Sequence, residues 1–172
     1  MVTTSFPVGP NRASGIFVKR LADSICDRVD LRILTPSSLS PCPDYAGYQV
    51  FCFRYAPYKW QILAHEPGGV LVALKVRPWL VAILPVFILS LFLSVIRSGR
   101  EADIIHANWS ITGVIAGLAG LCIGKPVITT LRGSDVSSIE RSRISRLIVV
   151  QALRLSKRVV TVSDAITGSL AA

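Results

Sequence analysis

Four short polar stretches of the sequence hold residue types that could bind a polar ligand. His106 could hydrogen-bond a sugar or shuttle a proton, and Arg132 could bind a phosphate in a bidentate manner. Gly15 at a helix start could bring bare backbone N–H groups to a phosphate. The stretches are Ser14-Gly15, His106-Ala107-Asn108-Trp109-Ser110, Arg132-Gly133-Ser134-Asp135 and Ser163-Asp164.

Each of these residues also has a purely structural explanation. His106 could be a partly buried histidine with satisfied hydrogen bonds, and Arg132 could lie at the surface or pair with Asp135. Asp135 and Asp164 could cap helices without touching a ligand, and Gly15 could be an ordinary helix-start glycine. The residues alone therefore indicate a nucleotide- or phosphate-binding α/β domain, with both explanations open for each candidate.

The sequence favours neither a hydrolase nor a metal centre. No serine–histidine–acid set and no paired carboxylates suited to hydrolysis can be recognised. The histidines, His65 and His106, stand at no zinc spacing from the cysteines, which form no C-x-x-C pair. We therefore expect no bound metal and no cofactor.

Short apolar runs alternating with helical patterns predict a parallel sheet with crossover helices on both faces. Two successive halves of this kind predict the strand order 3-2-1-4-5-6. The polar stretches then follow the carboxyl ends of strands, and Gly15, His106 and Arg132 should line one crevice. Strands are expected over residues 1–5, 29–35, 49–56, 102–107, 127–131 and 159–162, and helices over 15–28, 111–123 and 139–155.

Periodicity and small residues predict how two of the helices pack. Phe17, Leu21 and Ile25 recur four apart and predict the buried stripe of the first helix. Ser110 is the expected N-cap of the helix over 111–123. Three glycines on one side of that helix allow close approach to the sheet: Gly113, Gly117 and Gly120.

Composition favours one domain with an anionic partner. The 172 residues are 51% hydrophobic and 17% charged, with a mean hydropathy of +0.55, a net charge of +9 and a pI near 10. Apolarity combined with basic charge favours a membrane surface. Nucleic acid is not expected, because no aromatic residues are interleaved with basic ones as in single-strand binding. Basic residues between 141 and 158 could bind lipid headgroups or lie on a solvated helix face.

The most apolar stretch, residues 79–96, contains no charge. Its length would suit a transmembrane helix, but a crossing would separate the three strands before it from the three after it. Pro85 would also kink a continuous helix. Two interpretations remain open: a helix buried against the sheet, or a helix or hairpin lying in the headgroup region with basic flanks.

The cysteines and the N-terminus favour the cytoplasm. The four cysteines, at positions 26, 42, 52 and 122, are scattered, so we expect no disulfides and a reducing compartment. The first residues lack the basic and apolar regions of a signal peptide. We expect a cytoplasmic protein, with a peripheral position on the inner face of the membrane as the second option.

Four motifs, in their order along the chain, resemble the N-terminal domain of the GT-B family 4 glycosyltransferases. VTTSFP at 2–7 with SGIFV at 14–18 resembles the family's opening, and DIIHANW at 103–109 resembles its mid-domain strand with an H-x-H-W-like ending. GKPVITTLRGSD at 124–135 resembles the family's G-K-P…H-G-S-D segment, and RVVTVS at 158–163 resembles the strand that closes the first domain. The resemblance covers nearly the whole chain.

This resemblance implies two Rossmann-like domains facing a cleft. The N-terminal domain mostly holds the acceptor, and the C-terminal domain binds the nucleotide-sugar and carries an E-x7-E motif. Transfer is retaining and metal-independent, with a carbohydrate or lipid-linked acceptor and the nucleotide-sugar as co-substrate. The candidate residues for binding the acceptor or the donor phosphate are then Gly15, His106, Asn108, Arg132, Ser134 and Asp135.

His106 and Asn108 are the candidate catalytic residues, but the sequence departs from the family pattern at two positions. Many members have histidine where Asn108 and Arg132 stand. Asparagine can orient a hydroxyl but cannot act as a base, which puts a catalytic role at that position in doubt.

Residues 1–172 correspond to the N-terminal, acceptor-side domain, so we expect no sugar transfer by them without a donor-binding half. Two alternatives share the same fold. One is a non-catalytic membrane-surface binding module, and the other is half of a GT-B sugar epimerase.

Overall fold

A computed structural model describes residues 1–8, 14–64, 69–135 and 142–171. The chain divides into two compact units, one with Met1 and residues 3–94 and one with Val2 and residues 95–172. All pairs between the strands described are parallel, and helices separate most of them along the chain. The predicted α/β class is therefore confirmed.

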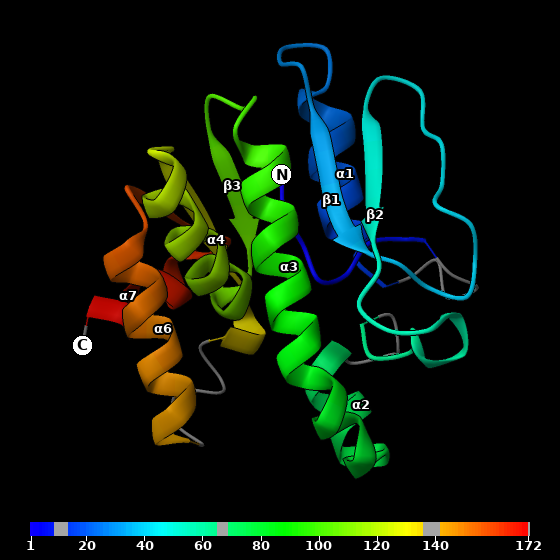
Figure 1. The fold of residues 1–172 in the computed structure, drawn as a ribbon. Coiled ribbons are helices and arrows are strands. Elements are labelled where there is room, and N and C mark those ends of the chain that lie inside the picture. Colours follow the sequence, from blue (N-terminus) through cyan, green and yellow to red (C-terminus); the bar gives the residue numbers. More distant parts are fainter. Residues whose placement is uncertain (9–13, 65–68, 136–141, 172) are drawn as a thin grey trace. The chain divides into compact units, whose positions relative to one another are not determined.

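The first unit contains a parallel two-stranded sheet. Strand β1 (Arg32–Pro36) pairs with β2 (Gln49–Phe53), as predicted for these neighbours (Figure 1). Helix α1 (Ile16–Ile25) precedes β1, and the 3-10 helix η1 (Tyr58–Trp60) and α2 (Gly69–Val76) follow β2. The largest fully buried side chains of this unit are Phe6, Phe87, Ile33, Leu63, Leu80 and Leu91.

Two predictions for the first unit are wrong. Residues 1–5 form no continuous strand: Met1 and Thr3 bond the backbone of Leu34 and Val2 makes an isolated parallel bridge with Ala107, but the chain bends after Thr3, whose hydroxyl bonds the backbone of Ser5. The predicted stripe of α1 is not its buried side: Phe17 is 63% exposed, whereas Val18 and Ala22 are buried. A four-residue spacing identifies a helix side, but packing decides how the helix is rotated about its axis.

The expectation of free cysteines is also wrong. Cys42 and Cys52 form a disulfide with their Cα atoms 5.8 Å apart. The chain after β1 turns back through a bridge between Tyr45 and Tyr48 and enters β2, which contains Cys52. Disulfides persist in oxidising compartments, so the cysteines no longer support the predicted reducing cytosol.

The charge-free segment is helical, but only one of its sides is buried. It consists of the 3-10 helix η2 (Pro78–Ile83) and helix α3 (Leu84–Gly99), and Pro85 lies in the first turn of α3, where proline is tolerated. Phe87 packs on Phe53 and Tyr55. The stretch is long and apolar enough to cross a membrane. Only 28% of its most apolar 18 residues are buried within the protein. Burial against protein therefore accounts for one side of the segment.

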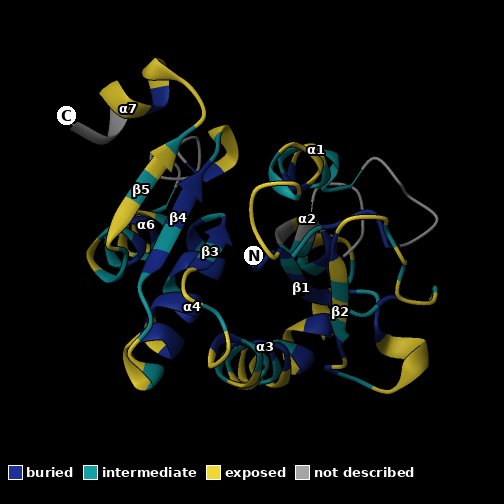
Figure 2. Cartoon of the chain, turned by 90° about the horizontal axis from the view of Figure 1, so that it is seen from above, coloured by how far each residue is buried: buried dark blue, intermediate teal, exposed yellow. Residues whose placement is uncertain are grey.

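The second unit contains three parallel strands. Their order is β3 (Ile105–Asn108), β4 (Val127–Leu131) and β5 (Arg158–Thr161), as predicted for these neighbours. Helix α4 (Ser110–Ile123) packs on β3, β4 and α6 (Arg143–Leu155), and α7 (Asp164–Ala171) follows β5. Figure 2 shows that the central strand β4 is mostly buried, whereas β5 alternates between intermediate and exposed residues.

The glycines of α4 allow the close packing that the sequence predicts. A Cβ at Gly113 would lie 2.7 Å from the side chain of Thr129 in β4, and one at Gly117 would lie 2.5 Å from Leu155 in α6. The small face therefore admits both the sheet and the neighbouring helix. The predicted N-cap is wrong by one residue: Trp109 is the N-cap, and Ser110 is the first helical residue.

Candidate functional site

The candidate site of the second unit centres on a one-residue turn between β3 and α4. β3 ends at Asn108 and α4 begins at Ser110, so Trp109 alone reverses the chain. Trp109 has φ 72° and ψ 153°, and it is the one non-glycine residue with positive φ in the part of the chain that the structure describes. This backbone region is almost reserved for glycine, and a side chain there costs about 1–3 kcal/mol. Neighbouring contacts must supply that energy.

Asp135 holds this turn from the segment that follows β4. Its Oδ1 accepts hydrogen bonds from the backbone N–H and the hydroxyl of Ser110, at 2.9 and 2.6 Å. Its Oδ2 accepts the backbone N–H of Arg132 at 2.9 Å. The carboxylate is buried and sits at the N-terminus of α4, where the helix dipole favours a negative charge. Asp135 thus joins the ends of two neighbouring strands.

Arg132 and Asn108 form the polar centre of the cluster. An Arg132 Nη2 donates to Asn108 Oδ1 at 3.2 Å, and the guanidinium carbon lies 5.4 Å from the centre of the Trp109 ring. Asn108 is fully buried, and its Nδ2 has no hydrogen-bond partner among the described residues. Burial lowers the pKa of Arg132, while the nearby Asp135 carboxylate acts in the opposite direction. Asn108 therefore orients a cation that remains charged at neutral pH.

His106 lies on β3, two residues before Asn108. Its Nε2 is 2.7 Å from the hydroxyl oxygen of Thr130 on the neighbouring strand β4. Burial lowers the pKa of His106 to about 4, and the positive charge of Arg132 adds to this effect. The imidazole is therefore neutral at physiological pH, and Thr130 fixes its orientation. Such a ring can orient a hydroxyl through hydrogen bonds but is a weak proton acceptor.

Gly15 belongs to the first unit and has a sufficient steric reason to be glycine. It is the N-cap of α1 with φ 74°, and a Cβ there would lie 2.3 Å from the carbonyl oxygen of Ser5. The hydroxyls of Ser5 and Ser14 lie 2.6 Å apart beside it. The close backbone approach explains the residue type, and a phosphate-binding role for Gly15 stays a prediction.

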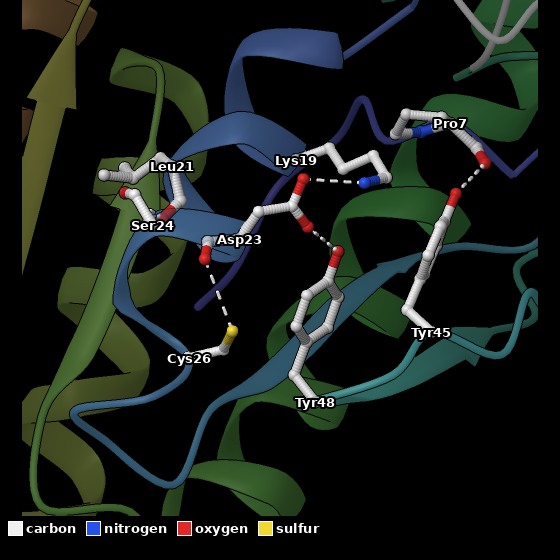
Figure 3. Close-up of polar contacts among 8 residues, drawn as sticks. All are labelled: Pro7, Lys19, Leu21, Asp23, Ser24, Cys26, Tyr45 and Tyr48. Carbon is white, nitrogen blue, oxygen red and sulfur yellow. Dashed lines mark hydrogen bonds and ion pairs between the residues drawn. The ribbon is translucent and has the colours of Figure 1, made fainter.

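Figure 3 shows a polar cluster of the first unit that the motifs did not indicate. Lys19 forms an ion pair with Asp23 at 2.7 Å, and the Tyr48 hydroxyl donates to Asp23 at 2.9 Å. The Tyr45 hydroxyl donates to the carbonyl of Pro7 at 3.1 Å. The hydrogen bond from Lys19 lowers the pKa of Asp23, and burial raises the pKa of Tyr48. This cluster fastens α1 to the turn before β2.

Four of the predicted site residues, His106, Asn108, Arg132 and Asp135, gather in the second unit at the carboxyl ends of β3 and β4. Ser134 is adjacent and exposed. The one-crevice prediction that includes Gly15 stays a prediction. Among the described residues, no group of three or more His, Cys, Asp and Glu side chains could hold a metal ion. The sequence placed Trp109 in a candidate stretch and in the H-x-H-W-like motif, but it assigned the residue no role.

The model of one protein family, described as Glycosyltransferase Family 4, matches residues 14–172. The chain belongs to Glycosyltransferase Family 4. No curated protein matches it. In this Family 4 domain, the two positions at which the sequence predicts departures from the family pattern contact each other, since Arg132 bonds Asn108. The asparagine–arginine contact places a positive charge in the cluster.

Proposed function

We propose that this chain is the acceptor-side domain of a retaining, metal-independent glycosyltransferase. The enzyme would transfer a sugar from a nucleotide-sugar donor to a carbohydrate or lipid-linked acceptor. The observation that carries the proposal is the Family 4 match over residues 14–172. The polar cluster supports it, because ligands of parallel sheets bind beyond the carboxyl ends of the strands.

The cluster offers two kinds of chemistry to such substrates. The neutral imidazole of His106 can orient the acceptor hydroxyl, and Arg132 can attract a phosphate of the donor or acceptor. In the transfer, the acceptor oxygen bonds to the anomeric carbon as the bond to the diphosphate breaks, and the hydroxyl proton leaves with the diphosphate. The chain's net charge of +9 would raise the local concentration of such anionic substrates.

The test compares residues 1–172 with the same chain continued through its natural reading frame. We expect the continued chain to turn over labelled nucleotide-sugar. In the continued chain, His106→Ala should lower the rate of this turnover. Residues 1–172 contain no E-x7-E motif and should show no transfer. A stop codon directly after Ala172 would favour a binding module, and a second half without transferase activity but with sugar epimerisation would favour an epimerase. Transfer by residues 1–172 alone would refute the proposal that they form only the acceptor-side domain.

We further propose that the first unit docks on an anionic membrane surface through an apolar face of α2, η2 and α3. Val76 is 70% exposed, and Val86 and Leu89 are each more than half exposed on one side of α3. Trp60 and Trp79 pack against each other and stay exposed, as is typical of a membrane interface. The exposed lysines Lys59 and Lys75 are close in sequence to these elements and would add attraction to anionic lipid.

Vesicle partitioning tests the membrane proposal. The pair Lys59→Gln and Lys75→Gln should weaken binding to phosphatidylglycerol-containing vesicles about thirtyfold, since each surface lysine contributes roughly 1 kcal/mol. The double variant Val86→Asp and Leu89→Asp should abolish binding. Asp at Ile144 and Leu147, exposed apolar residues of α6 in the other unit, is the matched control. Equal partitioning onto neutral and anionic vesicles would contradict the electrostatic part of the proposal.

A further inference from the structure

Trp109 combines a conformation that glycine would adopt without strain with the largest side chain available. Its φ of 72° and ψ of 153° lie outside the regions that L-residues favour. Strain of this kind persists where the surrounding contacts over-determine the backbone, and it concentrates at functional sites. The ring therefore needs an explanation that the turn itself does not provide, because Gly would make the same turn more easily.

The contacts around Trp109 fix both its backbone and its ring. The Trp109 N–H donates to the Thr130 carbonyl at 2.9 Å, and the Trp109 carbonyl accepts the Gly113 N–H at 2.9 Å in the first turn of α4. Asp135 holds the next residue, Ser110, by two hydrogen bonds. The guanidinium of Arg132 packs over the indole. The ring is thus preorganised, which reduces the entropy that a ligand would lose on contacting it.

The position and partial exposure of the indole suit a sugar ring. Trp109 is neither exposed nor fully buried; it follows the carboxyl end of β3, which contains His106, and its ring contacts Arg132. A pyranose has an apolar C–H face and a rim of hydroxyls, so it can cover an aromatic ring while its rim bonds polar neighbours. We propose that the Trp109 indole is a stacking platform for a pyranose ring of the acceptor or the donor. This proposal rests on the glycosyltransferase function proposed above.

The indole N–H signals in a proton–nitrogen NMR spectrum test the platform directly. The chain has three tryptophans, and Trp109→Phe assigns the relevant signal. Methyl pyranosides serve as acceptor-type probes, and nucleotide diphosphate-sugars with their free nucleotides serve as donor-type probes. We expect a saturable shift of the Trp109 signal with one class of sugar and unchanged Trp60 and Trp79 signals. Dissociation constants should be in the millimolar range usual for such small ligands.

Two substitutions test whether the Trp109 ring binds a ligand or only packs within the protein. Trp109→Gly relieves the backbone strain and removes the ring, so it should fold yet raise the dissociation constant at least about tenfold. Trp109→Phe keeps an aromatic face and should stay within about threefold of the wild type. A Trp109 signal that ignores every pyranoside and nucleotide-sugar, or Trp109→Gly with unchanged affinity, would overturn the proposal.

Failure of the platform can be told apart from failure of the transferase. If the continued chain transfers sugar while the Trp109 signal stays unchanged, the platform is refuted but the transferase function is not. If the Trp109 signal shifts with pyranosides but the continued chain turns over no nucleotide-sugar, the platform is supported and the transferase function is refuted.

Discussion

Removal of the Asp135 carboxylate should destabilise the second unit strongly. Asp135→Ala removes the acceptor of three donors: the buried N–H and hydroxyl of Ser110 and the part-buried N–H of Arg132. A hydrogen bond to a charged group contributes about 1.5–3 kcal/mol, and leaving a buried donor unpaired adds a desolvation penalty. Because two of the bonds share one oxygen, we expect a loss of about 3–5 kcal/mol rather than the full sum.

Asp135→Asn should cost less, about 2 kcal/mol. Its carbonyl oxygen can still accept from Ser110, but its NH2 group then faces the Arg132 N–H, which places two donors together. Ser110→Ala combined with Asp135→Ala should show a coupling of about 1 kcal/mol or more, because the two residues are in contact. Asp103→Asn, at an exposed position, is the control and should stay within about 0.5 kcal/mol of the wild type.

Urea unfolding followed by tryptophan fluorescence measures these free energies in the second unit. In a Trp60→Phe, Trp79→Phe background, Trp109 is the sole tryptophan and reports on the β3–α4 turn. An Asp135→Ala variant as stable as the Asp103→Asn control would refute the reasoning, since the carboxylate would then not hold the turn.

Three further predictions follow from packing, ionisation and the thiols. In thermal unfolding, Gly117→Ala should destabilise the chain by about 1–2 kcal/mol, because overpacking against α6 outweighs the gain of about 1 kcal/mol in helix propensity. Gly168→Ala is the control and should be neutral or stabilising, because a Cβ there meets open space. NMR should find His106 titrating near pH 4. Since its pKa is lower than in the unfolded chain, His106 should lower stability by roughly 3 kcal/mol as pH drops from about 6.5 to 4, and His106→Gln should remove this contribution. A thiol-specific reagent in denaturant should count two free cysteines, because Cys42 and Cys52 are paired; four would contradict the disulfide.

Local sequence patterns were sufficient for the class of fold and the family. Alternating apolar runs and helical periods predicted parallel neighbours in each unit, since strand formation and crossover direction follow from local pattern and chirality. The α4 glycines were also readable, because three small residues on one helix side indicate close packing. The motif around His106 and the segment ending at Asp135 pointed to the family that the match over residues 14–172 confirms.

Features that depend on contacts between distant residues required the tertiary structure. The rotation of α1 is decided by what packs on Val18 and Ala22, which a period of four cannot determine. The disulfide depends on how the chain after β1 turns back beside β2. The contact of Arg132 with Asn108 joins positions 24 residues apart. The strained backbone of Trp109 is held by contacts from the strand, the helix and Asp135 together. Local sequence patterns do not predict such combined contacts.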